Sequence, residues 1–234
     1  MGKIKLGVMD DVRGKVGKVI GGVWNGISYL RAIPSHVKNP NTLAQQKQRL
    51  RFKLTAELMS SLSPVINYGF ATGEGGRTPV NRALSFNISH ILTGEFPDYE
   101  IDYSKLVIAR GKLSGIYDAT VSGDTWRTVR FTWEHIEETG NAKDDDRILL
   151  LVIDVDKGVP IYRTEDINRA DEEAEFTIPK SFTGDTFEAY LAVTRRDGSI
   201  AADSLYLGSF TATDQEPSDP DPGEGEGDGG GDDS

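Results

Sequence analysis

The chain has 234 residues and is acidic, with 37 Asp and Glu against 26 Lys and Arg and a formal net charge of −11. It contains no cysteine, which excludes disulfides, thiolate metal sites and cysteine nucleophiles. The overall acidity disfavours anionic partners for the molecule as a whole, so that only a local basic patch would attract one.

The charge is distributed unevenly along the chain. Residues 1–58, which we call the basic front segment, contain 11 Lys and Arg against three acids, a balance of +8. Residues 214–234 contain nine acids and no base, which leaves −10 for residues 59–213. Such a polarity is informative about partners rather than about the fold.

Residues 1–38 are rich in glycine and contain short apolar stretches of the kind that form β-hairpins. Asn25-Gly26 separates two of these stretches, and Asn-Gly favours the positive φ angles of a type I′ turn. Pro34 is expected to end the pairing because it lacks an N–H. Gly14-Lys15 is followed by valine rather than by Ser or Thr and a helix, which argues against a phosphate-binding loop.

Two helices are predicted between residues 42 and 94. Thr42 and Gln45 fit a capping box, which starts a helix that reaches about residue 61. The first half of this helix is polar almost all round, so we expect it to project from the core. Thr78-Pro79 predicts the start of the second helix, and Gly94 its end. The buried stripe of the second helix is expected to comprise Leu84, Ile88, Ile91 and Leu92.

From about residue 98 the sequence has the short, regularly spaced strands that are typical of an antiparallel sandwich. The continuous apolar run at residues 148–154 is expected to be a central strand. Turns are expected at residues 157–158 and 196–198. The seven predicted strands span residues 105–110, 128–133, 148–154, 160–163, 175–178, 187–194 and 205–211.

The predicted fold class is an α+β N-terminal module of β-hairpins and two helices, followed by an all-β sandwich like those of immunoglobulin and fibronectin type III domains. The domain boundaries are expected at residues 1–95 for the module, 98–213 for the sandwich and 214–234 for an acidic tail. Because the tail has no apolar residue to bury, we expect it to be disordered.

Two sets of motifs resemble known families. Val129-x-Phe131-x-Trp133, followed by Tyr190-x-x-Val193 and Asp197-Gly198, resembles strands B, F and G of fibronectin type III domains. This resemblance covers about half of the chain and implies a sandwich but no particular activity.

A longer set of motifs runs up to about residue 210 and leaves out the acidic tail. The motifs are Gly14-Lys15-Val16-Gly17, Trp24-x-Gly26-Ile27, Arg31-x-x-Pro34, Lys38-Asn39-Pro40-Asn41-Thr42, Ala44-Gln45-Gln46-x-Gln48-Arg49, residues 96–103 and Tyr206-Leu207-Gly208-Ser209. Together they resemble an uncharacterised Bacteroidota family, the domain-of-unknown-function (DUF) family 6266. This family implies no activity and no site residue.

The residues that commonly perform catalysis do not form a recognisable pattern. The three histidines, His36, His90 and His135, lack metal-binding spacing, and there is no Gly-x-Ser-x-Gly motif. Asp154-x-Asp156-x-Gly158 resembles part of a calcium loop, but its glycine falls one place early and it lies between predicted strands, which favours a turn. Residues 144–146, three aspartates, are expected to form a solvated loop. We therefore expect no enzyme activity, no cofactor, no metal and no small-molecule substrate.

The sequence also bears on location. No apolar run approaches the ~20 residues of a membrane-spanning helix, and the N-terminus lacks the apolar stretch of a signal peptide. We expect a protein that does not bind membranes and is cytoplasmic, or one that is associated with a virion, a phage or another particle.

The main candidate site is the basic cluster of the front segment, to which Trp24 adds an aromatic side chain. We predict a structural or adaptor protein that binds a protein partner, or that self-assembles when this module docks on the acidic part of another copy. The opposing interpretation is a solvated helix face. The candidate residues are Trp24, Arg31, Lys38, Lys47, Arg49, Arg51 and Lys53.

The alternative hypothesis is a nucleic-acid-binding protein that uses the same basic module. Its aromatic residues would stack on bases, and the acidic tail would compete with the ligand. At 100° per residue, Lys47 and Arg51 point to one side of the helix, and Arg49 and Lys53 to another. No single basic stripe results, which weakens the case for duplex binding.

Overall fold

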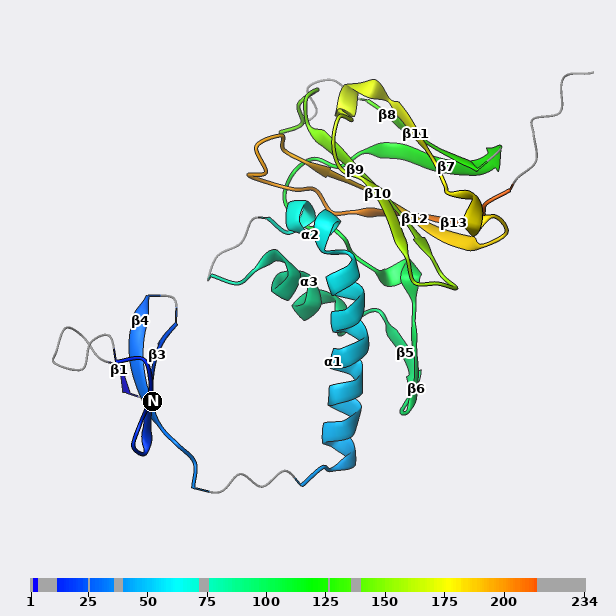
Figure 1. The fold of residues 1–234 in the computed structure, drawn as a ribbon. Coiled ribbons are helices and arrows are strands. Elements are labelled where there is room, and N and C mark those ends of the chain that lie inside the picture. The colour runs from blue at the N-terminus through cyan, green and yellow to red at the C-terminus, as the bar shows by residue number, and fades with distance from the viewer. Residues whose placement is uncertain are drawn as a thin grey trace, which may run out of the picture.

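The computed structural model describes residues 2–3, 12–24, 26–35, 40–71, 76–125, 127–135 and 140–213. These residues form a small N-terminal sheet, three α-helices, a short hairpin and a β-sandwich (Figure 1). The helices are α1 (Leu43–Ser61), α2 (Ser63–Gly69) and α3 (Pro79–Asn87). None of the helices in the described part of the chain is both long and apolar enough to cross a membrane.

The N-terminal sheet is antiparallel, with the strand order β1-β4-β3-β2. Trp24 pairs with Ile27 across the predicted hairpin turn, where Gly26 has a φ of 74°. The hairpin is thereby confirmed, although Asn25 itself lies outside the described residues. Figure 1 draws the sheet apart from the helices and the sandwich. Its strands are β1 (Gly2–Lys3), β2 (Gly14–Val16), β3 (Val19–Trp24) and β4 (Ile27–Ala32).

Helix α1 begins and ends as the sequence predicts. The hydroxyl of Thr42 accepts a hydrogen bond from the N–H of Gln45, and the Gln45 side chain accepts one from the N–H of Thr42, which completes the capping box. The first half of α1 projects away from the sandwich (Figure 1), and Leu58 and Met59 in its second half are buried.

The predicted second helix is shorter than expected: α3 ends at Asn87 and does not reach Gly94. The buried amide of Asn87 donates to the carbonyl of Val107 and accepts from its N–H, at 2.9 and 3.0 Å, which ties the end of α3 to a distant segment. Leu92 and Gly94 therefore belong to a strand, not to the helix. They lie in β5 (Leu92–Glu95), which pairs with β6 (Asp98–Ile101) as a hairpin.

In the described residues, seven antiparallel strands form two packed sheets, which confirms that this part of the chain is a β-sandwich. One sheet has the order β10-β9-β12-β13 and the other β11-β8-β7. The apolar run at residues 148–154 is central, because β9 lies between β10 and β12. The strands are β7 (Tyr117–Thr125), β8 (Thr128–Glu134), β9 (Arg147–Asp154), β10 (Pro160–Arg163), β11 (Glu173–Thr177), β12 (Thr186–Thr194) and β13 (Leu205–Thr211).

The first predicted strand, at residues 105–110, is wrong. A single 3-10 turn (Tyr103–Lys105) leads into irregular chain there, whose buried Leu106 and Ile108 pack into the core. The first strand of the sandwich is instead β7. Its pairing with β8 shifts register twice, although its apolar residues Tyr117, Ala119 and Val121 alternate with polar ones along the sequence.

The two faces of β9 belong to two hydrophobic cores. Ile148, Leu150 and Val152 pack between the two sheets of the sandwich. Leu149, Leu151 and Ile153 pack against α1, α2 and α3, together with Tyr190 of β12. The hydrophobic contacts therefore cross the boundary that the sequence places between residues 95 and 98, and the helices are held by the sandwich.

Candidate interaction surface

The strand register of the N-terminal sheet sorts its side chains onto two different faces. Directly paired residues lie on the same face, and consecutive residues of a strand lie on opposite faces. One face, which we call the aliphatic face, has no charged residue among those described; it comprises Val16, Val19, Val23, Leu30 and Ala32 with Gly14, Gly21 and Ser28. The other, the basic aromatic face, comprises Lys15, Ile20, Gly22, Trp24, Ile27, Tyr29 and Arg31.

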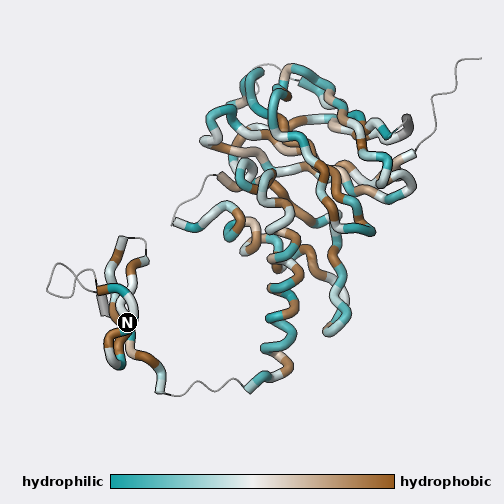
Figure 2. The backbone as a smooth tube through the Cα atoms, viewed as in Figure 1, coloured by the Kyte–Doolittle hydropathy of each residue, from teal (hydrophilic) through white to brown (hydrophobic). Residues whose placement is uncertain are grey.

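Both faces are open to solvent. Gly21 is the only buried residue among those described in the sheet, and brown apolar stretches run through it in Figure 2. Trp24 and Ile27 on the basic aromatic face are 66% and 42% exposed, and Val16 and Val23 on the aliphatic face are 58% and 40% exposed. These exposed apolar groups make the sheet a candidate interaction surface.

Glycine is required at the centre of the sheet, where other groups approach the backbone. A Cβ atom on Gly21 would lie 2.0 Å from the carbonyl oxygen of Val12, whose main chain therefore crosses the aliphatic face. On the basic aromatic face, a Cβ on Gly22 would lie 2.9 Å from the hydroxyl of Tyr29, which lies over that glycine.

Two of the candidate residues meet on this sheet. Trp24 pairs with Ile27 at the hairpin end of the basic aromatic face, and Arg31 pairs with Ile20 at the opposite end, beside Lys15. Four residues along β3 separate the ends, or ~14 Å. Lys38 lies outside the described residues.

The remaining candidate residues lie on α1, where they differ in exposure and in the groups that they contact. Lys47 is exposed, and Lys53 lies 3.9 Å from Glu57 with both side chains largely exposed. Arg51 donates to the carbonyl of Ile88 at 3.1 Å and so contacts the C-cap residue of α3, which gives it a role within the fold.

Arg49 contributes to a shallow hollow on the projecting half of α1. Its guanidinium donates to the Asn41 side chain at 3.1 Å. The hollow has a volume of about 380 Å³, and Phe52 beside it is 51% exposed. The lining residues are Gln45, Gln48, Arg49 and Phe52.

Several described cations of the front segment lie in no ion pair. In the described part of the chain, Lys15, Arg31 and Lys47 lie in no ion pair with a carboxylate. These three cations are therefore available to an anionic partner.

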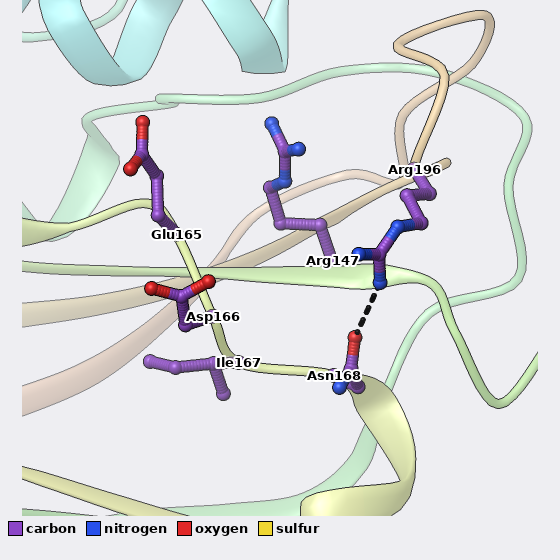
Figure 3. Close-up of a pocket in the computed structure, with 6 residues that line it drawn as sticks. All are labelled: Arg147, Glu165, Asp166, Ile167, Asn168 and Arg196. Atoms are coloured by element: carbon purple, nitrogen blue, oxygen red, sulfur yellow. Dashed lines mark hydrogen bonds between the residues drawn. The ribbon is translucent and has the colours of Figure 1, made fainter.

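A second candidate is a cavity of about 330 Å³ at one end of the sandwich (Figure 3). Arg196 donates to the side chain of Asn168 at 3.3 Å, and the guanidinium of Arg147 lies 4.9 Å from the ring centre of Tyr68. Two guanidinium groups and two carboxylates line it, so its formal charges balance. The lining residues are Arg147, Glu165, Asp166, Ile167, Asn168 and Arg196.

Next to this cavity is an ionic cluster that sequence reasoning missed. Asp146, expected in a solvated loop, is fully buried, with its carboxylate 3.3 Å from Arg195 and 3.6 Å from Arg169. Arg169 also donates to the carbonyls of Ser114 and Gly115. Burial lowers the pKa of Arg169, and Asp146 opposes that shift. The cluster joins distant segments, so no local pattern marks it.

The calcium-like motif serves a turn. The buried carboxylate of Asp154 accepts the backbone N–H groups of Asp156 and Lys157, both at 2.8 Å. This confirms the turn predicted at residues 157–158. Within the described ranges, no three His, Asp or Glu side chains gather in a way that would hold a metal ion.

Comparison with known proteins identifies similarities of sequence and of fold. A family model described as "Family of unknown function (DUF6266)" matches residues 11–208. No curated protein matches the sequence. Among solved structures, the fibronectin type III domain of human contactin 1 is 11% identical, covers 47% of this chain and 87% of its own, and gives a TM-score of 0.34. That of human collagen alpha-1(XX) is 10% identical, covers 47% and 92%, and gives 0.31. A redesigned β-sandwich protein is 15% identical, covers 45% and 96%, and gives 0.33.

Proposed function

The chain belongs to the DUF6266 family of unknown function, and we propose that it is a non-enzymatic adaptor whose basic front segment binds an anionic protein surface. The observation that supports this most is the basic aromatic face. It presents an exposed tryptophan and two unpaired cations on one side of a sheet in which, among the described residues, only Gly21 is buried.

The layout of this face indicates the chemistry of the partner. Tryptophan and arginine are the side chains that most often dominate the binding energy of protein interfaces. Trp24 would enter an apolar pocket, while Lys15 and Arg31 would meet carboxylates ~14 Å away from it. The hollow beside Phe52 on α1 would provide a second contact.

We expect Trp24→Ala and Arg31→Glu to abolish capture of the partner by the full-length protein. Loss of an interface tryptophan or reversal of an interface charge weakens binding by about 30-fold or more. Affinity capture from the source organism, compared across variants by quantitative mass spectrometry, would measure this. Lys180→Glu is the matched control, because it makes the same charge change on the exposed surface of the sandwich. Equal capture by all variants would contradict the proposal.

Nucleic acid is the second candidate, and the same face carries the observation that favours it. Trp24 and Tyr29 share a sheet surface with Lys15 and Arg31, an arrangement that would suit stacked bases and a phosphate backbone.

If single-stranded nucleic acid is the ligand, deletion of residues 214–234 is expected to tighten its binding, because nine competing acids are removed. Fluorescence anisotropy of a labelled oligonucleotide would measure the change. Each lost phosphate contact, as in Arg31→Glu, should lower the log–log salt slope by about 0.7. If the truncated protein fails to bind DNA and RNA at low salt, this candidate is removed and the protein partner stays.

A further inference from the structure

A cluster of ionisable side chains that the proposed function does not use lies where the turn after β9 meets the chain before β12. The Nζ of Lys157 donates to the carboxylate of Asp185 and, at 2.9 Å, to the carbonyl of Ser181. It also lies 4.7 Å from the ring centre of Phe182. The side chain of Lys157 is 44% exposed as a whole, but its amine contacts a carboxylate, a carbonyl and an aromatic ring.

A second carboxylate lies beside this pair. Asp154 is fully buried, and its Oδ2 is 3.9 Å from the Nζ of Lys157. Its other oxygen, Oδ1, accepts two backbone N–H groups of the turn, but no donor in the described part of the chain hydrogen-bonds to Oδ2. A buried carboxylate oxygen without a donor is costly, and an ordinary surface ion pair of lysine and aspartate does not need such a third group.

We propose that Lys157 and Asp185 condense to an amide, which is an isopeptide bond between their side chains. The Nζ of Lys157 forms a bond to Cγ of Asp185, and the bond from Cγ to one carboxylate oxygen breaks. That oxygen leaves as water with two of the three ammonium protons, so atoms and charges balance without an oxidant or another reactant. The remaining N–H is the donor that Oδ2 of Asp154 lacks.

Asp154 is the group that moves the protons. The pair starts as ammonium and carboxylate, because the hydrogen bond from Lys157 lowers the pKa of Asp185, and Asp154 lowers it too. An ammonium group is not a nucleophile, so a base must first remove a proton from it. The Oδ2 of Asp154 lies next to the ammonium, where it takes a proton and passes it to the leaving oxygen of Asp185.

The fold supplies the proximity that such a condensation needs. Groups held in contact in the right orientation react as if each were present at an effective concentration of up to about 10⁵–10⁸ M. Both partners are fixed by their own backbones. The N–H of Asp185 donates to the carbonyl of Phe182 at 3.2 Å, and the N–H of Lys157 donates to Oδ1 of Asp154 at 2.8 Å. The bond would tie the end of β9 to the start of β12.

Mass spectrometry of the full-length protein tests the proposal. The wild-type protein should be lighter than its sequence by one water molecule. A tryptic digest should contain residues 148–163 joined to residues 181–195, because trypsin does not cleave after an acylated lysine. Lys157→Arg retains the positive charge and should show neither change. Asp154→Asn should slow the reaction by about 100-fold or more, whereas Asp156→Asn, at the exposed position two residues later, should not.

A wild-type protein with the full mass of its sequence would overturn the proposal. A mass loss that persists in Lys157→Arg would also overturn it, because the water would then come from another reaction, such as succinimide closure at Asp197-Gly198. Equal cross-linking in Asp154→Asn and Asp156→Asn would overturn the role of Asp154. Circular dichroism checks that the variants fold. The basic aromatic face is not involved, so these results leave the proposed function to its own test.

Discussion

Asp146→Ala is expected to lower the free energy of unfolding by about 3–5 kcal/mol, the largest effect of any single ionic change considered for this fold. The reason is that Asp146 is fully buried with its carboxylate beside the guanidinium groups of Arg169 and Arg195. Without the carboxylate, these two poorly solvated guanidinium groups would lose the buried negative charge that they share. Urea denaturation followed by far-ultraviolet circular dichroism measures the change.

Asp145→Ala is the matched control for this experiment. Asp145 is the adjacent residue of the same loop and is exposed, so its replacement should change the free energy of unfolding by no more than about 0.5 kcal/mol. Adding Arg169→Met to Asp146→Ala should cost less than the sum of the two single changes, because the two residues share one interaction. If Asp146→Ala and Asp145→Ala unfold alike, the cluster is not a source of stability.

Ile66→Ala is expected to destabilise the helices and the sandwich together, by about 2–5 kcal/mol. Ile66 in α2 is fully buried and belongs to the core that contains Leu151 and Tyr190 of the sandwich. The substitution removes apolar groups from a core that both parts share and leaves a cavity there. Hydrogen exchange of the β9 and β12 amides reports on the sandwich, and the helical circular dichroism signal reports on the helices.

The outcome depends on whether the helices and the sandwich unfold as one unit. A shared core predicts a single transition, in which the amides of β12 lose protection at the same denaturant concentration as the helices. Leu43→Ala is the control, because Leu43 is 57% exposed in the first turn of α1. If Ile66→Ala melts the helices while the strands stay protected, the parts are energetically separate, as the sequence boundary at residues 95–98 predicts.

The elements that the sequence predicts correctly are those with local causes. The capping box at Thr42, the tight turn before Ile27 and the apolar run of β9 depend on neighbouring residues. The error at the end of α3 involves a distant contact, because that end is tied to Val107, 20 residues away, and no local pattern marks it. The strand β7 does have a short alternating run, at Tyr117, Ala119 and Val121, which the prediction overlooked.

The candidate site follows the same rule. The positive charge of the site is visible in the composition. The turn before Ile27 is a local signal for the arrangement of the side chains, because it pairs Trp24 with Ile27 and this register determines which residues share a face. The role of Arg51 could not be found in this way. It depends on the carbonyl of Ile88, 37 residues further along the chain.

Helix α1 has a mechanical consequence. Its 19 residues form one unbroken helix of about 28 Å. Its C-terminal half packs in the core that includes residues of β9 and β12. Pulling on its free end would be resisted by the packing of Leu58 and Met59 rather than by the short segment that precedes the helix. If the front segment binds the proposed partner, force on that partner would reach the sandwich through α1.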